Sequence, residues 1–175
     1  IGFSLMLVMR WQLAYPDTAV PFIGGLVKWL ATLNGFASNG NLPADLYNVF
    51  GAMHGTIMIF LGVVPLVVGA FGNYIVPLQI GAPDMAFPKL NMASYWVYFI
   101  GGVIMLVSFF LPGGAANSGW TSYPPLSDIA TIGQTYWLLG MVFLITSSLL
   151  GSINIIVTIV QLRAEGMTWM RLPFF

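Results

Sequence analysis

Apolar residues occur along this chain in long, nearly unbroken stretches, and the charged residues fall between them. Three runs contain no Asp, Glu, Lys or Arg: residues 46–83, 90–127 and 129–162. The apolar core of a bilayer is about 30 Å thick and takes about 20 mostly apolar residues of helix to cross. The expected fold class is therefore an all-α, multi-pass transmembrane helix bundle. Three complete helices are predicted, over about 46–74, 92–111 and 135–162.

The remaining segments predict shorter elements. Residues 1–10 resemble the last turns of a cut apolar helix, so we interpret the chain as an internal fragment, one part of a single membrane domain spanning 1–175. Within about 20–33, apolar residues recur at helical spacing beside Lys28 and Trp29, which predicts a short interfacial helix. Pro65 predicts a kink in the first complete helix.

Composition excludes several classes of protein. The chain is 58% hydrophobic and 6% charged, whereas soluble domains are about 25% charged. A nucleic-acid partner bound by a basic face, a disordered chain and a disulfide scaffold are therefore excluded. With no Cys, the chain has no thiolate chemistry and no Cys-ligated metal. The sparse Lys and Arg residues favour an inner location for residues 75–91 and for the chain after Leu162.

His54 is the only histidine, and it lies inside a predicted membrane helix. An ionisable residue there indicates function by default, and imidazole is a common ligand of metals and haem iron. The alternative is a histidine hydrogen-bonded to a neighbouring helix. Gly51 and Gly55 flank it at a spacing typical of close helix packing, which would equally leave room for a flat macrocycle.

Asp84 lies in the predicted inner connection. From His54 to Asn73 the predicted helix is about 28 Å long, and Asp84 lies in the loop beyond it. It is either a solvated loop carboxylate or the inner end of a proton path. Polar residues nearby favour a chain of waters, although they also suit helix–helix contacts. These residues lie on three predicted helices: Asn73, Asn91, Ser94, Ser147, Ser148, Asn154 and Thr158.

Other residues near the outer ends of the helices have two interpretations each. Arg10 either extends to the lipid headgroups or hydrogen-bonds the polar edge of a cofactor. Tyr47, Trp120 and Tyr123 either belong to an interfacial aromatic belt or meet the carboxylates of a cofactor.

Four stretches carry a resemblance to subunit I of the haem–copper oxidases, the cytochrome c oxidase family. They are LYNVFGAMHGTIMIF (46–60), FGNYIVPLQIGAPDMAFPKLN (71–91), GWTSYPPL (119–126) and SSLLGSINIIVTI (147–159). The stretch VMRWQLAYP (8–16) fits the end of the family's first helix. Lys89 and Met92 depart from the family's usual Arg and Asn.

The resemblance implies roles for particular residues. His54 matches an axial ligand of the low-spin haem, a haem a if Arg10 bonds its formyl group. Tyr47 and Trp120 match residues near haem propionates, and Asp84 matches the acid at the mouth of the D proton channel. The polar residues that match this channel are Asn73, Asn91, Ser94, Ser147, Ser148 and Asn154.

The whole protein implied is a proton-pumping terminal oxidase that oxidises cytochrome c and reduces oxygen to water. The resemblance places it in a bacterial plasma membrane or mitochondrial inner membrane, with the electron-accepting subunit II as partner. The ligands of the high-spin haem and copper belong to later helices, so no catalytic residue is expected in this chain. The alternatives are a quinol oxidase, a nitric oxide reductase relative and a haem-free transporter.

Overall fold

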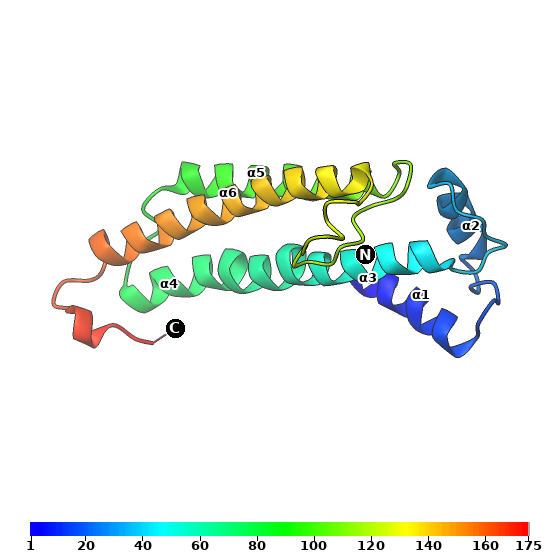
Figure 1. The fold of residues 1–175 in the computed structure, drawn as a ribbon. Coiled ribbons are helices and arrows are strands. Elements are labelled where there is room, and N and C mark those ends of the chain that lie inside the picture. The colour runs from blue at the N-terminus through cyan, green and yellow to red at the C-terminus, as the bar shows by residue number, and fades with distance from the viewer. Residues whose placement is uncertain (175) are drawn as a thin grey trace.

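The computed structural model describes residues 1–174, and this part of the chain is helical, without strands (Figure 1). Helices satisfy their own backbone hydrogen bonds, which a lipid environment requires of any spanning segment. The elements in order are α1 (Gly2–Ala14), α2 (Gly24–Leu33), α3 (Ala44–Thr56), η1 (Ile57–Val63), η2 (Pro65–Gly72), α4 (Asn73–Ile80), α5 (Pro88–Ser108), α6 (Ile132–Gln161) and η3 (Trp169–Arg171).

Three helices are long and apolar enough to cross a membrane, which confirms the predicted architecture. They are Ala44–Ile80, Pro88–Ser108 and Ile132–Gln161, with 37, 21 and 30 residues. The first extends past Tyr74 to Ile80, where Gly81 ends it in a left-handed conformation (φ +74°) that suits glycine. The second begins at Pro88 instead of Met92, because proline is well tolerated in the first turn of a helix.

The middle of the long helix departs from α geometry. From Ile57 to Gly72 it is almost entirely π-helical, with backbone hydrogen bonds that span five residues. The sequence predicts a kink at Pro65, and the structure has π geometry on both sides of that residue. A π turn holds more residues than an α turn, so His54 and Asn73 lie closer along the axis than the 28 Å expected from an α-helix. None of the residues of η1 and η2 is buried.

Helices α5 and α6 form the closest pair in the bundle (Figure 1). Their backbones meet at two glycines. A Cβ added to Gly101 would lie 2.9 Å from the Gly140 carbonyl oxygen, and one added to Gly140 would lie 2.6 Å from Met105 Cγ. Small residues permit this approach, which is how membrane helices associate without a hydrophobic driving force. The Tyr98 hydroxyl donates to the Leu61 carbonyl (2.8 Å) and links this pair to the long helix.

The connections lie toward the two ends of the bundle, as alternating crossings require, and the one between α5 and α6 folds back along the long helix (Figure 1). At one end, the Ala164 N–H donates to the Ile80 carbonyl (2.8 Å), which joins the chain after α6 to the last residue of α4. At the other end, the buried Asn34 amide donates to the Phe109 carbonyl (3.2 Å). Helix α2 lies at this second end; it buries Val27 and Ala31 while it exposes Trp29.

Candidate functional site

His54 lies half-buried in α3, facing the beginning of α1. Its Nδ1 atom is 2.8 Å from the Gly2 carbonyl oxygen. A carbonyl can only accept, so this contact requires the tautomer that carries the proton on Nδ1. The other nitrogen, Nε2, then has its lone pair available. A ligating histidine is commonly oriented by a hydrogen bond from its non-ligating ring N–H to a carboxylate, a backbone carbonyl or a water.

The two glycines beside His54 allow close contacts with other parts of the chain. A Cβ on Gly51 would lie 3.4 Å from Met9 Cε, and a Cβ on Gly55 would lie 3.3 Å from Trp120 Cδ1. Side chains of α1 and of the connection after α5 therefore cover both glycine faces. These contacts favour the close-packing interpretation over one in which the glycines leave room for a macrocycle.

Arg10 and Tyr47 lie on the same pair of helices but not beside His54. Helix α1 runs antiparallel to α3, since Gly2 contacts Ile57 while Met9 contacts Gly51. Arg10 is eight residues from Gly2, or about 12 Å farther along α1, and its side chain is exposed. Tyr47 is half-buried and packs on the main apolar core. Both residues lie toward the end of the bundle that carries α2.

Trp120 is the predicted site residue that the structure brings closest to His54. It comes from the connection between α5 and α6, and its ring packs on α3 next to Gly55. Its ring centroid lies 6.3 Å from that of Phe60. The side chain remains 49% exposed.

Asp84 lies at the opposite end, in the exposed connection between α4 and α5. Its Oδ1 atom accepts a hydrogen bond from the Met85 N–H (2.7 Å). Two fully buried residues of α6 hold the backbone that follows. The Phe87 N–H donates to Asn154 Oδ1 (2.8 Å), and the Ala86 N–H donates to Thr158 Oγ1 (2.9 Å).

Asn154 and Thr158 thus form a clamp on the Asp84 connection. The Asn154 amide also donates to the Phe87 carbonyl (3.3 Å), and the Thr158 hydroxyl donates to the Asn154 carbonyl (2.7 Å). On the sequence alone, Thr158 counts among the polar residues near Asp84 but is not assigned to the channel. Its spacing of four residues from Asn154 was the available signal, since such residues share a helix face.

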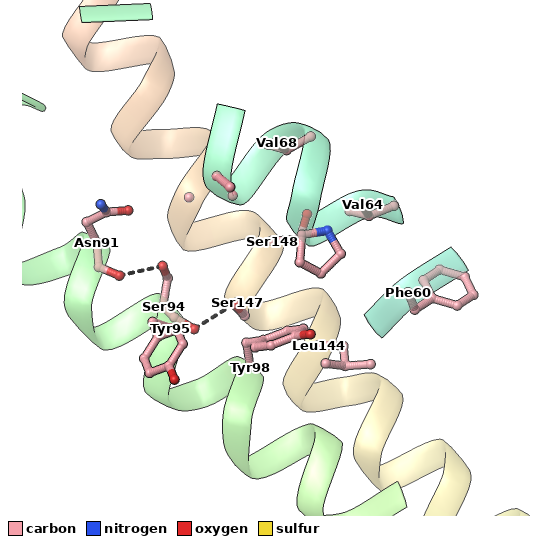
Figure 2. A pocket seen from close by; sticks show the side chains of 14 residues that line it. Phe60, Val64, Val68, Asn91, Ser94, Tyr95, Tyr98, Leu144, Ser147 and Ser148 are labelled. Carbon is pink, nitrogen blue, oxygen red and sulfur yellow. Dashed lines mark hydrogen bonds between the residues drawn. The ribbon is translucent and has the colours of Figure 1, made fainter. Parts of the chain in front are cut away.

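Four of the predicted channel residues line one cavity of about 360 Å³ between η1–η2, α5 and α6. Figure 2 shows Asn91 and Ser94 on α5 and Ser147 and Ser148 on α6 around it. The Ser94 hydroxyl donates to the Asn91 carbonyl (2.7 Å) and the Ser147 hydroxyl to the Ser94 carbonyl (2.6 Å). Because their protons are engaged in these bonds, the hydroxyl oxygens of Ser94 and Ser147 can still accept hydrogen bonds from water. The volume accommodates several waters.

Asn73 and Asn154 do not line this cavity. The Asn73 amide donates to the carbonyl of Gly69, a lining residue (2.6 Å), while its Oδ1 is buried without a partner. An unpaired buried acceptor is uncommon and suits a bound water. Asn154 directs its amide to the Asp84 connection instead. The structure therefore separates the predicted channel set into cavity-lining residues, Asn73 beside the cavity, and the clamp.

Within residues 1–174, no three His, Asp or Glu side chains come together as a metal-binding group. The single histidine is consequently the described residue best suited to bind a metal, and it offers one nitrogen.

Comparison with known proteins covers the whole chain. The family model for cytochrome c and quinol oxidase polypeptide I matches residues 1–175. Cytochrome c oxidase subunit 1 of Thermostichus vulcanus is 50% identical over 87% of this chain and 28% of its own length. A probable cytochrome c oxidase subunit 1-alpha of Streptomyces coelicolor is 48% identical, with 100% of this chain and 27% of its own length covered.

A probable subunit 1-beta of Nocardia farcinica is 47% identical over 100% of this chain and 26% of its own length. The chain thus spans about a quarter of the length of these curated relatives.

Proposed function

This chain belongs to the cytochrome c and quinol oxidase polypeptide I family, as a part of cytochrome c oxidase subunit I, and from that premise we propose what it does. The full protein is the catalytic subunit of a proton-pumping terminal oxidase that oxidises cytochrome c and reduces oxygen to water. This chain supplies one axial ligand of the low-spin haem and the entrance of the D proton channel.

The observation that carries the haem assignment is the hydrogen bond between His54 Nδ1 and the Gly2 carbonyl (2.8 Å). It fixes the proton on Nδ1, limits rotation of the ring, and leaves Nε2 as the nitrogen able to bind iron. A haem bound there supplies reversible one-electron transfer. Among the residues of this chain, Arg10, Tyr47 and Trp120 are those we assign to its polar edge.

The entrance of the proton channel is assigned to the opposite end. Asp84 is exposed to solvent there, while the clamp of Asn154 and Thr158 fixes the backbone beside it. Asn91, Ser94, Ser147 and Ser148 then line a cavity with room for several waters. Asn73, with an unpaired buried oxygen next to the cavity, offers a further site for a water. These groups can hold a hydrogen-bonded path inward from the carboxylate.

The rest of subunit I holds the high-spin haem and the copper. We further propose that the protein assembles with an electron-accepting subunit II, takes electrons from cytochrome c and resides in a bacterial plasma membrane. The family also includes quinol oxidases. Oxygen consumption by the purified complex with reduced cytochrome c, and then with a quinol, decides between the two donors.

Replacement of His54 by Ala in the full-length oxidase tests the haem assignment. We expect the low-spin haem spectrum to disappear, because one of the two axial positions loses its ligand. The control is Asn48→Ala, an exposed residue of the same helix, which keeps the spectrum. A normal low-spin spectrum in the His54 variant would reject the assignment.

A further inference from the structure

The first turn of α6 has the sequence of a capping box but is not capped by it. Thr131 precedes the helix and Gln134 follows three residues later, a pattern in which the two side chains ordinarily bond the free N–H groups of the first turn. Here no side chain caps the helix. The Thr131 hydroxyl instead donates to the Gly113 carbonyl (3.5 Å), and Gln134 reaches into the preceding connection.

Gln134 closes a ring of hydrogen bonds with two serines, which we name the serine–glutamine ring (Ser118, Ser122 and Gln134). The Ser118 hydroxyl donates to Gln134 Oε1 (2.6 Å), and Gln134 Nε2 donates to the Ser122 hydroxyl oxygen (2.7 Å). The two serine oxygens lie 3.3 Å apart. Gln134 is only 4% exposed, so its amide has few alternative partners in water.

The backbone around the ring is pressed against the start of α6. A Cβ added to Gly133 would lie 2.9 Å from both Ala115 Cα and its carbonyl carbon, closer than real Cβ atoms approach other atoms. Gly119 has φ +77°, and Ser122 has φ +52°, a value that is uncommon for a residue other than glycine. Hydrogen bonds to the Ser122 hydroxyl help to hold this conformation.

The two serines bracket Trp120. Each lies two residues from it, so the ring fixes the backbone on both sides of the indole. The indole in turn packs on α3 at Gly55, directly after His54. The ring is therefore the link that sets where this aromatic surface lies relative to the proposed haem ligand.

We propose that Ser118, Ser122 and Gln134 are positioning residues that hold the Trp120 indole against the turn of α3 that carries His54. This inference rests on the proposed haem site. An indole held there excludes water from the neighbourhood of the ligand. A dry environment favours the less charged, reduced form of a haem, so loosening Trp120 lowers the midpoint potential of the haem.

The test uses the full-length oxidase complex and the variant Gln134→Leu, which keeps side-chain volume but cannot bond either serine. Limited chymotryptic cleavage after Trp120 reports how often the connection opens, and a spectroelectrochemical titration reports the midpoint potential of the low-spin haem. We expect cleavage at least tenfold faster and a lower midpoint potential, equivalent to at least a threefold change in the reduction equilibrium. Ser118→Thr keeps the hydroxyl and should behave as the parent protein.

Two further variants test whether the change in the haem midpoint potential depends on the Trp120 indole. Ser38→Ala removes a hydroxyl that bonds the Asn41 carbonyl (2.6 Å) within another connection at this end, and it should change neither readout. Trp120→Phe should lower the potential by itself. Adding Gln134→Leu to Trp120→Phe should lower it no further, because the ring acts through the indole.

An unchanged cleavage rate in Gln134→Leu would overturn the proposal, as would an equal fall in potential when Gln134→Leu is added to the parent protein and to Trp120→Phe. If Gln134→Leu does not assemble, Ser122→Ala removes one bond of the ring and should still raise the cleavage rate about threefold. Retention of the low-spin spectrum in His54→Ala would reject the haem site instead. The cleavage measurement involves no haem and would still decide whether the ring holds the connection.

Discussion

The two ends of the long helix Ala44–Ile80 hold their candidate residues in different ways. Beyond the Ile80 end, the backbone after Asp84 is bonded by Asn154 and Thr158, both fully buried in α6. Toward the Ala44 end, the His54 ring has one hydrogen bond, to the Gly2 carbonyl. The nearest aromatic candidate, Trp120, is still half exposed.

The difference shows that this chain specifies the two sites to different degrees. At the Asp84 end, buried hydrogen bonds between α6 and the connection fix the backbone, and buried polar groups tolerate little rearrangement. At the His54 end, the imidazole itself is oriented by one hydrogen bond, and the serine–glutamine ring holds only the connection that carries Trp120. The proposed low-spin haem requires a second axial ligand, and the relatives are about three to four times as long as this chain. Mutations can therefore test each end separately.

The largest effect is expected from Asp84→Asn in the full-length oxidase. We expect turnover to fall at least tenfold and pumping to be lost, because an amide cannot take up and release protons at the entrance. The haem spectrum should stay normal, since the two ends are separate. Oxygen consumption and proton release from vesicles measure this. Asp128→Asn, which changes an exposed carboxylate at the other end, is the control. Normal proton-to-electron stoichiometry at normal turnover in Asp84→Asn would exclude the entrance role.

A smaller effect is expected from Thr158→Val, which removes the clamp hydroxyl while keeping side-chain shape. The Ala86 N–H would lose its acceptor, and an unsatisfied buried group costs about 1–3 kcal/mol. We expect a lower unfolding temperature and a moderate loss of turnover with an intact haem spectrum. Thr146→Val is matched to it, because Thr146 is an exposed residue of α6 that bonds only the Val142 carbonyl. Equal stability of the two variants would contradict the clamp.

The smallest effect is expected from Gly2→Ala. Its Cβ would lie 2.9 Å from Ile57 Cγ2 and 3.0 Å from Met58 Sδ, so α1 must shift slightly. The bond from His54 to the Gly2 carbonyl should then lengthen, and the low-spin haem band should move while ligation persists. Gly25→Ala, which has open space around it, should leave the band in place. An unmoved band in Gly2→Ala would indicate that this hydrogen bond does not tune the ligand.

Much of the fold could be predicted from the sequence, because charge-free runs of this length have few stable alternatives in a membrane. The ends of the helices were less predictable. The long helix continues through Pro77 to Ile80, and its middle adopts π geometry that no periodicity had indicated. The expected stump also extends beyond Arg10 to Ala14.

The candidate site was predictable where its members share one helix face, as Ser147 and Asn154 do along α6. Contacts between distant segments were not predictable. The sequence could not show that Asn154 bonds the Phe87 backbone, nor that Trp120 covers Gly55, since both depend on how a loop returns to a helix. The flanking glycines consequently had two interpretations until their neighbours were known.

His54 lies nearer one end of a continuous helix, and Asp84 lies just beyond the other end. This separation has a consequence for the membrane voltage. Under the proposed function, protons enter the protein from one face while electrons arrive toward the opposite face. When these protons and electrons are consumed together inside the protein in the reduction of oxygen, charge is transferred across the bilayer even before any proton is pumped. Moving one elementary charge across a potential of 100 mV takes about 2.3 kcal/mol. Under the proposed function, the separation of the two ends makes oxygen reduction itself a voltage-generating reaction.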